Sequence, residues 1–180
     1  MIISVKSYLF RFGYRAVIII LLFLACSGPQ TEGNLVLKFK TTSYGGSYAQ
    51  ANIGAVWIEN SDGDFIKTLQ CWGDTQRMHL VHWQAESGGN CIQAVTSATL
   101  STHVSHETSW DCTDFHGDVV RDGMYSVCME FTEDNAYFRP EKAKVLCIPF
   151  NKGKTAVQIA CADTVFFKNV NLEYLAFPAW

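Results

Sequence analysis

One pair of apolar runs joined by a tight turn restricts the fold of this chain more than any other feature. The runs lie at residues 52–59 and 65–72, and the turn between them contains Asp62-Gly63. An Asp-Gly dipeptide between two apolar runs is a strong signal for a β-hairpin, because the glycine readily adopts the positive φ that such turns require. The sequence therefore predicts two antiparallel strands at these positions.

The rest of the chain also has the pattern of short strands between turns. Leu35, Leu37 and Phe39 alternate with residues that include two lysines, which is typical of a strand with one buried face. Further strands are predicted near residue 106 and at residues 124–131, 143–150, 155–160 and 164–174. One short helix is predicted at residues 78–86, where Leu80 and Trp83 can face one side. These elements predict an all-β fold, an Ig-like β-sandwich with one short helix, in a single domain at residues 35–180.

The first 25 residues have the composition of an export signal. Three basic residues, Lys6, Arg11 and Arg15, precede an apolar run at residues 16–24. A membrane span takes about 20 apolar residues, so this run is too short to be one. We therefore expect a signal peptide at residues 1–25.

Cys26 distinguishes this signal from an ordinary one. It follows Ala25 at the position where a lipoprotein signal peptidase leaves the first residue of the mature protein. We expect lipidation of Cys26 and a linker at residues 26–34, with an ordinary signal peptide or an uncleaved anchor as the alternatives. Ser27 resembles the residue found at this position in lipoproteins of the outer membrane.

The charge of the mature chain bears on its partners. Residues 1–25 hold three of the 14 basic residues and none of the 17 acidic ones, which leaves 11 basic against 17 acidic residues and a formal charge of −6. Phosphate binding requires clustered Lys and Arg, which the mature chain lacks, so nucleic acid is not an expected partner. We expect contact with the membrane through the lipid on Cys26, and an envelope protein as the partner.

Six cysteines follow Cys26, and in an exported protein they suggest disulfides. They are Cys71, Cys91, Cys112, Cys128, Cys147 and Cys161, and their spacing leaves the connectivity open. Cys128 and Cys147 lie in apolar strand-like runs, so buried free thiols are the alternative for these two. The chain contains no CxxC pair, which excludes the usual zinc-ribbon and thioredoxin-like motifs.

Two kinds of side chain raise the question of a metal site. Four aspartates lie in one turn-rich segment: Asp111, Asp114, Asp118 and Asp122. Their spacing does not fit a calcium-binding EF-hand loop, and hydrogen bonds to turn backbone are the commoner use of such residues. The histidines are His79, His82, His103, His106 and His116. His103 and His106 lie three residues apart in a predicted loop, and a copper or zinc ion on this pair, with His116 or an aspartate, is one hypothesis. Solvated loop side chains are the alternative.

No group of residues forms a recognisable catalytic motif. The chain lacks a G-x-S-x-G elbow, a phosphate-binding P-loop and a dinucleotide-binding fingerprint. Enzyme activity is therefore not expected.

Two sets of residues resemble known families. The set Trp110-Asp111, Thr113-Asp114, Gly117, Gly123 and Tyr125 resembles the Ig-like module of flagellar hook-capping proteins. A wider set resembles an uncharacterised family of predicted periplasmic proteins, a domain of unknown function; it comprises residues 55–59, Asp62-Gly63, Thr68-Leu69, Trp72-Gly73, Trp83 and residues 94–99 before Trp110. This second resemblance runs from about Asn52 to Tyr174 and implies a periplasmic β-sandwich without an established activity.

In that family, the segment that corresponds to residues 93–99 usually reads Asp-Ala-Val-Thr-Gly-Ala-Thr. It is similar to the motif on which a flavin transferase esterifies FMN, through its phosphate, to a threonine. The resemblance implies that Thr99 is the acceptor, although Gln93 replaces the acidic residue and Ser97 replaces the glycine. A Ser/Thr-rich loop that enters a strand is the alternative interpretation.

Three functions are compatible with these patterns. The favoured one is a non-enzymatic lipoprotein that binds or scaffolds a partner at the cell envelope. The alternatives are an extracytoplasmic electron carrier with FMN on Thr99, and a metal-binding domain that uses the loop histidines. We expect an exported, lipid-anchored protein in the outer membrane that faces the periplasm or the cell surface.

Overall fold

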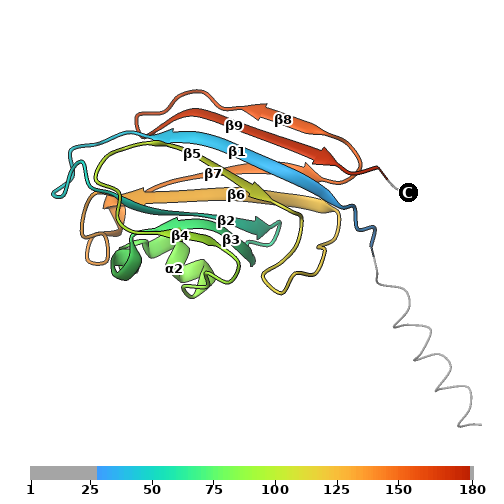
Figure 1. The fold of residues 1–180 in the computed structure, drawn as a ribbon, viewed down its shortest axis with the longest axis horizontal. Coiled ribbons are helices and arrows are strands. Elements are labelled where there is room, and N and C mark those ends of the chain that lie inside the picture. The colour runs from blue at the N-terminus through green and yellow to red at the C-terminus, as the bar shows by residue number, and fades with distance from the viewer. Residues whose placement is uncertain (1–27, 179–180) are drawn as a thin grey trace, which may run out of the picture.

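The computed structural model describes residues 28–178, which form two β-sheets and one short α-helix (Figure 1). The strands are β1 (Gly33–Thr41), β2 (Ile53–Asn60), β3 (Phe65–Trp72), β4 (Val95–Ser97), β5 (Ser105–Trp110), β6 (Gly123–Thr132), β7 (Lys144–Lys152), β8 (Val157–Ala160) and β9 (Phe167–Ala176). The α-helix is α2 (Val81–Ser87), and two 3-10 helices are η1 (Asp74–His79) and η2 (Pro140–Lys142). The predicted signal peptide and Cys26 lie outside the described residues. Within residues 28–178, no helix has the length and apolar character that a membrane span needs.

The first sheet has the strand order β5-β1-β9-β8, and all its neighbouring strands are antiparallel. In β1, Leu35, Leu37 and Phe39 are buried, whereas the residues between them are more exposed. Because side chains of a strand point alternately to its two faces, one face of this sheet is apolar. The second sheet covers that face.

The second sheet has the strand order β4-β3-β2-β6-β7, and only the β3–β4 pair is parallel. The predicted hairpin is present as β2 and β3. In its turn, the Oδ1 atom of Asn60 accepts hydrogen bonds from the backbone N–H groups of Asp62 and Asp64 at 2.9 and 2.8 Å. Gly63 has a φ of 85°, which is the positive φ that the Asp-Gly turn predicts.

The main core lies between the two sheets. Its largest members come from both layers: Trp72 and Phe131 from the second sheet, and Trp110 and Tyr174 from the first, all at most 1% exposed. Gly54 of β2 leaves room for the ring of Trp72 on the neighbouring strand β3, because a Cβ atom there would overlap that ring. The predicted all-β sandwich is therefore confirmed.

The helix α2 lies against the opposite face of the second sheet (Figure 1). A second, smaller core lies between the helix and that face. Its buried members are Ile53, Ala55, Trp57, Cys71, Leu80, Trp83 and Cys128. Leu80 and Trp83 lie on the helix side of this core, as the sequence pattern predicts. The carboxylate of Glu130 accepts hydrogen bonds from the backbone N–H groups of His82 and Trp83 at 3.3 and 2.8 Å, near the start of the helix. Burial raises the pKa of Glu130 to about 7.

Two local features differ from the sequence-based expectation. The α-helix begins at Val81, because residues 78 and 79 belong to the preceding η1. The sequence pattern also does not indicate β4, which consists of three exposed residues. Its pairing with β3 depends on the fold and not on an apolar pattern of its own.

His106 is a buried ionisable residue of the main core. It is 5% exposed, and its ring stacks on Trp72 and Phe39 with centroid distances of 4.4 and 4.7 Å. Its Nε2 atom has no hydrogen-bond partner among the described residues. Burial lowers the pKa of His106 to about 4, with a smaller contribution from the charge of His103.

This environment predicts a loss of stability in acid. Because the pKa of His106 falls from 6.5 to about 4 on folding, the folded state disfavours protonation, and stability decreases as pH falls from 6.5 towards 4. We expect His106→Phe to keep the stack and to remove this loss. Its free energy of unfolding relative to wild type should rise by about 3 kcal/mol between pH 7 and pH 4 in urea denaturation. His116→Phe, at an exposed position, is the control. If the free energy of unfolding depended on pH in the same way in His106→Phe and in wild type, the prediction would be contradicted.

Candidate functional site

The segment of residues 91–99, which we call the Thr99 segment, runs along an edge of the second sheet. It contains β4, in which Thr96 lies opposite Cys71 of β3, and the backbone N–H of Gly73 donates to the carbonyl oxygen of Ser97 at 3.0 Å. Residues 95–99 are exposed, and the residues on either side of Ala98 are small and hydroxylated. The hydroxyl of Thr99 is therefore open to approach by another protein.

The chain is held firmly just after Thr99. Leu100 and Asn52 exchange two backbone hydrogen bonds of 2.9 and 3.1 Å. Asn52 is itself buried, and its Oδ1 atom accepts a hydrogen bond of 3.0 Å from Nε1 of Trp72. Thr99 thus combines an exposed side chain with a fixed position next to the core.

A cavity of about 350 Å³ opens beside Thr99. Its lining consists of Tyr48, Ala51, Asn52, Ile53, Gln76, His79, Thr99, Thr132, Glu133 and Asp134. Small-molecule sites in proteins range from about 300 to 1,000 Å³ and combine apolar surface with a few polar groups. Both the size and the composition of this cavity, which we call the Thr99 cavity, fit that description.

Glu133 organises the backbone on one side of the Thr99 cavity. Its side chain is fully buried, its Oε2 atom accepts hydrogen bonds from the N–H groups of Tyr44 and Gly46 at 2.9 and 3.2 Å, and its Oε1 atom lies 2.7 Å from Nε2 of His103. Burial alone would raise the pKa of Glu133, but the hydrogen bonds from His103 and its other partners outweigh that effect and lower it. A charged carboxylate is therefore built into this side of the cavity.

Two buried polar atoms of the cavity residues have no hydrogen-bond partner among the described residues. They are Oδ2 of Asp134, a residue only 5% exposed, and Nδ1 of His79. Burial lowers the pKa of His79, which favours the neutral ring near pH 7. Since buried polar atoms are normally hydrogen-bonded, these two are available to a ligand.

Glu133 and Asp134 are absent from the residues that the sequence singles out. They follow directly after the apolar strand β6, and an acidic pair at the end of a buried strand is the signal that points to them. Their proximity to Thr99 depends on the pairing of β2 with β6 and on the bridge between Asn52 and Leu100.

The five histidines do not come together. His103 lies 2.8 Å from Oγ1 of Thr41 through Nδ1 and contacts Glu133 through Nε2, whereas His106 lies in its aromatic stack. His82 and His116 are exposed, on α2 and in the loop before β6. In the part of the chain that the structure describes, no histidine belongs to a group of three potential metal ligands.

The aspartates of the turn-rich segment hold that segment in shape. Oδ1 of Asp114 accepts hydrogen bonds from the backbone N–H groups of His116 and Asp118, at 2.8 and 3.1 Å. Asp111 and Asp122 form ion pairs with Lys67 and Lys152, at 3.2 and 2.9 Å. These contacts agree with the turn interpretation.

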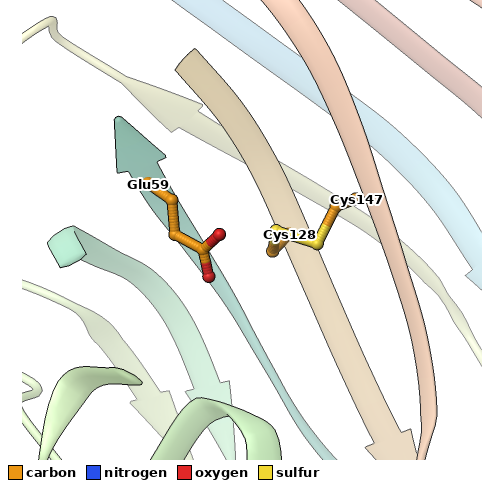
Figure 2. Close-up of side chains that lie close together, drawn as sticks. All are labelled: Glu59, Cys128 and Cys147. Atoms are coloured by element: carbon orange, nitrogen blue, oxygen red, sulfur yellow. A yellow bond between two sulfur atoms is a disulfide. The ribbon is translucent and has the colours of Figure 1, made fainter. Parts of the chain in front are cut away.

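Cys128 of β6 and Cys147 of β7 lie directly opposite one another and form a disulfide (Figure 2). The structure thus has a disulfide at these positions and not two free thiols. The side chain of Glu59 extends from β2 towards this pair, and its carboxylate lies within 4.8 Å of both sulfur atoms. Because the two sulfurs are bonded to each other, this group offers a metal ion one carboxylate only.

The carboxylate of Glu59 has a partner within the protein. Nε1 of Trp57 donates to its Oε1 atom at 2.6 Å. Burial raises the pKa of Glu59, and the hydrogen bond from Trp57 opposes that effect. The other four cysteines of the described residues, Cys71, Cys91, Cys112 and Cys161, are not bonded to one another.

Comparisons with known proteins give one positive result. Searches of curated proteins and of solved structures each found no match. The sequence model of one family, described as predicted periplasmic protein (DUF2271), matches residues 34–157. This region extends further towards the N-terminus than the resemblance seen in the sequence and includes the Thr99 segment; the likeness to hook-capping modules stays a prediction. The match covers more than half of the chain, which therefore belongs to the DUF2271 family of predicted periplasmic proteins.

Proposed function

We propose that this protein is a non-enzymatic, extracytoplasmic carrier that holds FMN as a phosphate ester on Thr99. The observation that carries the proposal is the position of Thr99, which is exposed, has small neighbours and lies at a cavity of about 350 Å³. The match to a family of predicted periplasmic proteins supports the extracytoplasmic location, and the similarity of residues 93–99 to a flavin-acceptor motif supports FMN on Thr99.

The surroundings of Thr99 suit both attachment and retention of such a group. A transferase must reach the hydroxyl from outside, and the edge position of β4 leaves that approach open. Tyr48 and Ile53 provide apolar surface in the Thr99 cavity, while Gln76 and Asn52 provide polar groups. Bound FMN supplies the electron-transfer chemistry, and the chain contributes its binding and orientation.

The first test is the intact mass and visible spectrum of the protein purified from its native host. We expect a yellow protein with a mass excess of one FMN less one water, and complete loss of both in Thr99→Ala. Thr96→Ala changes another exposed threonine of the same segment and should retain the flavin. A colourless protein without the mass excess would overturn the proposal, as would retention of the excess in Thr99→Ala.

The departures from the acceptor motif provide a second test. Gln93 has a positive φ of 62°, and Ser97 lies in β4, so both belong to the backbone that presents Thr99. Gln93→Asp combined with Ser97→Gly restores the usual family segment. If the transferase recognises the residues at these two positions, the flavin content of this double variant should equal or exceed that of wild type.

A binding module with a non-covalent ligand in the Thr99 cavity is the second candidate. The unpartnered buried atoms of Asp134 and His79 favour it, because a ligand that forms a hydrogen bond with each of them would satisfy both. Native mass spectrometry of the same preparation separates the two candidates. A mass excess that survives in Thr99→Ala but disappears on unfolding would support non-covalent binding and exclude the ester.

We also propose that lipid on Cys26 attaches the protein to the outer membrane, as the signal sequence and Ser27 suggest. The intact mass from the native host should include the lipid. Cys26→Ser should abolish that part of the mass and release the protein from the membrane fraction. An unlipidated wild-type protein would contradict this proposal without affecting the FMN assignment.

A further inference from the structure

Cys71 and Cys91 lie next to each other beneath α2. Their Sγ atoms are 3.0 Å apart, about 1 Å more than the length of a disulfide bond. Nη1 of Arg77 lies 3.0 Å from the sulfur of Cys91 and 3.4 Å from that of Cys71. Cys71 is fully buried, whereas Cys91 is partly exposed.

Hydrogen bonds that do not involve the sulfur atoms hold the two cysteines in this arrangement. Oγ1 of Thr68, in β3, donates to the carbonyl oxygen of Asn90 at 2.6 Å and so fixes the backbone just before Cys91. Nε1 of Trp83 donates to the same Thr68 oxygen at 3.0 Å. The pair is therefore brought together by the fold itself.

The other two unbonded cysteines are not placed to compete for these partners. Cys112 is a member of the main core between the sheets, and Cys161 packs against that core. Cys71 and Cys91 belong to the smaller core on the opposite face of the second sheet. The sheet therefore separates the two sets.

We propose that Cys71 and Cys91 form a second disulfide in the exported protein, which ties the start of the Thr99 segment to β3. The inference does not depend on FMN, because it rests on the positions of the sulfur atoms and of Arg77. The oxidant is the disulfide of an extracytoplasmic thiol oxidase, the class of protein that forms such bonds in exported chains.

The exchange takes place in two steps. The thiolate of Cys91, which is reachable from solvent and lies beside the Arg77 guanidinium, attacks one sulfur of the oxidase disulfide; a mixed disulfide forms and the other oxidase sulfur leaves as a thiolate. The sulfur of Cys71 then loses its proton and attacks that of Cys91, and the remaining oxidase sulfur leaves. Two protons and two electrons pass to the oxidase, which becomes a dithiol. Cys91 makes the first attack because it is partly exposed, whereas Cys71 is fully buried and burial raises the pKa of its thiol.

The bond would fix the Thr99 segment at both ends. Cys91 would hold its start to β3, and the Leu100–Asn52 bridge already holds its end. The backbone N–H of Ala94 also donates to the carbonyl oxygen of Cys91 at 3.1 Å, so the disulfide would also restrain the backbone that follows Cys91.

Peptide mapping of the full-length exported protein under non-reducing conditions tests the inference. After free thiols are blocked in denaturant, trypsin should release residues 68–77, which contain Cys71, linked to residues 78–121, which contain Cys91 and Cys112. The linked pair should be lighter by two hydrogen atoms than the sum of its reduced parts and should separate on reduction. In the same digest, residues 122–142 linked to residues 145–152 report the Cys128–Cys147 disulfide as an internal control for folding.

Two variants identify the partner of Cys71. Cys91→Ser should abolish the link to residues 78–121, whereas Cys112→Ser should retain it, and both should keep the Cys128–Cys147 link. Recovery of residues 68–77 from wild type with Cys71 carrying the blocking group would overturn the proposal. A link that survives in Cys91→Ser and disappears in Cys112→Ser would also overturn it.

Discussion

Replacing Glu133 with alanine is expected to lower the free energy of unfolding by about 3–5 kcal/mol, because it removes a buried carboxylate that accepts three hydrogen bonds. The side chain of Glu133 is fully buried and accepts from the backbone N–H groups of Tyr44 and Gly46, besides contacting His103. Alanine leaves these three groups without their acceptor, and each buried donor that loses its acceptor costs about 1–3 kcal/mol. Urea denaturation monitored by tryptophan fluorescence measures the change.

Two further variants separate this effect from a general loss of charge. Glu133→Gln keeps the size of the side chain and one acceptor oxygen, so it should cost clearly less than Glu133→Ala. Glu141→Ala, at an exposed position of η2, should change stability by less than about 0.5 kcal/mol. If Glu133→Ala cost no more than Glu141→Ala, the network would not contribute to stability as the structure indicates.

Replacing Trp83 with alanine is expected to cost a similar amount, about 3–5 kcal/mol, as for other large buried aromatic residues. Trp83 is 1% exposed and is the main contact between α2 and the second sheet, and its Nε1 atom donates to Oγ1 of Thr68. Alanine opens a cavity in the smaller core and leaves Thr68 without that donor. Urea denaturation again gives the free energy, and far-UV circular dichroism shows whether α2 is retained.

The neighbouring residue provides the matched control. His82 lies on the same helix but is exposed, so His82→Ala should change stability by less than about 0.5 kcal/mol. Trp83→Phe keeps most of the apolar volume and should fall between the two. A loss below about 1 kcal/mol for Trp83→Ala would mean that α2 contributes little to the fold.

The elements that the sequence predicts well are those whose information is local. The β2–β3 hairpin follows from Asp62-Gly63, and the helix follows from the spacing of Leu80 and Trp83. In contrast, β4 has no apolar pattern of its own, since all three of its residues are exposed, and it is a strand only because β3 lies beside it. A short edge strand of this kind depends on long-range pairing that a single sequence does not reveal.

The candidate site likewise combines residues with a local sequence signal and residues that only long-range strand pairing brings to it. Thr99 is a candidate because residues 93–99 resemble a flavin-acceptor motif, whereas Glu133 and Asp134 reach the Thr99 cavity only through the pairing of β2 with β6. The cysteines are similar: their spacing leaves the pairing open, but the register between β6 and β7 places Cys128 opposite Cys147. Sequence patterns therefore locate single residues, and strand register decides which of them meet.

The course of β1 determines where the Thr99 cavity would lie relative to a membrane. The strand begins at Gly33, paired with Ala176 at one end of the sandwich, and ends at Thr41, whose hydroxyl contacts His103 near the cavity (Figure 1). With the proposed lipid on Cys26, the few residues before Gly33 would hold the first end within roughly 25 Å of the bilayer surface. The nine residues of β1 rise by roughly 30 Å, so the cavity would lie at the end of the sandwich far from the tether. A partner would then reach it from the aqueous compartment, and the anchoring bilayer would not obstruct its approach.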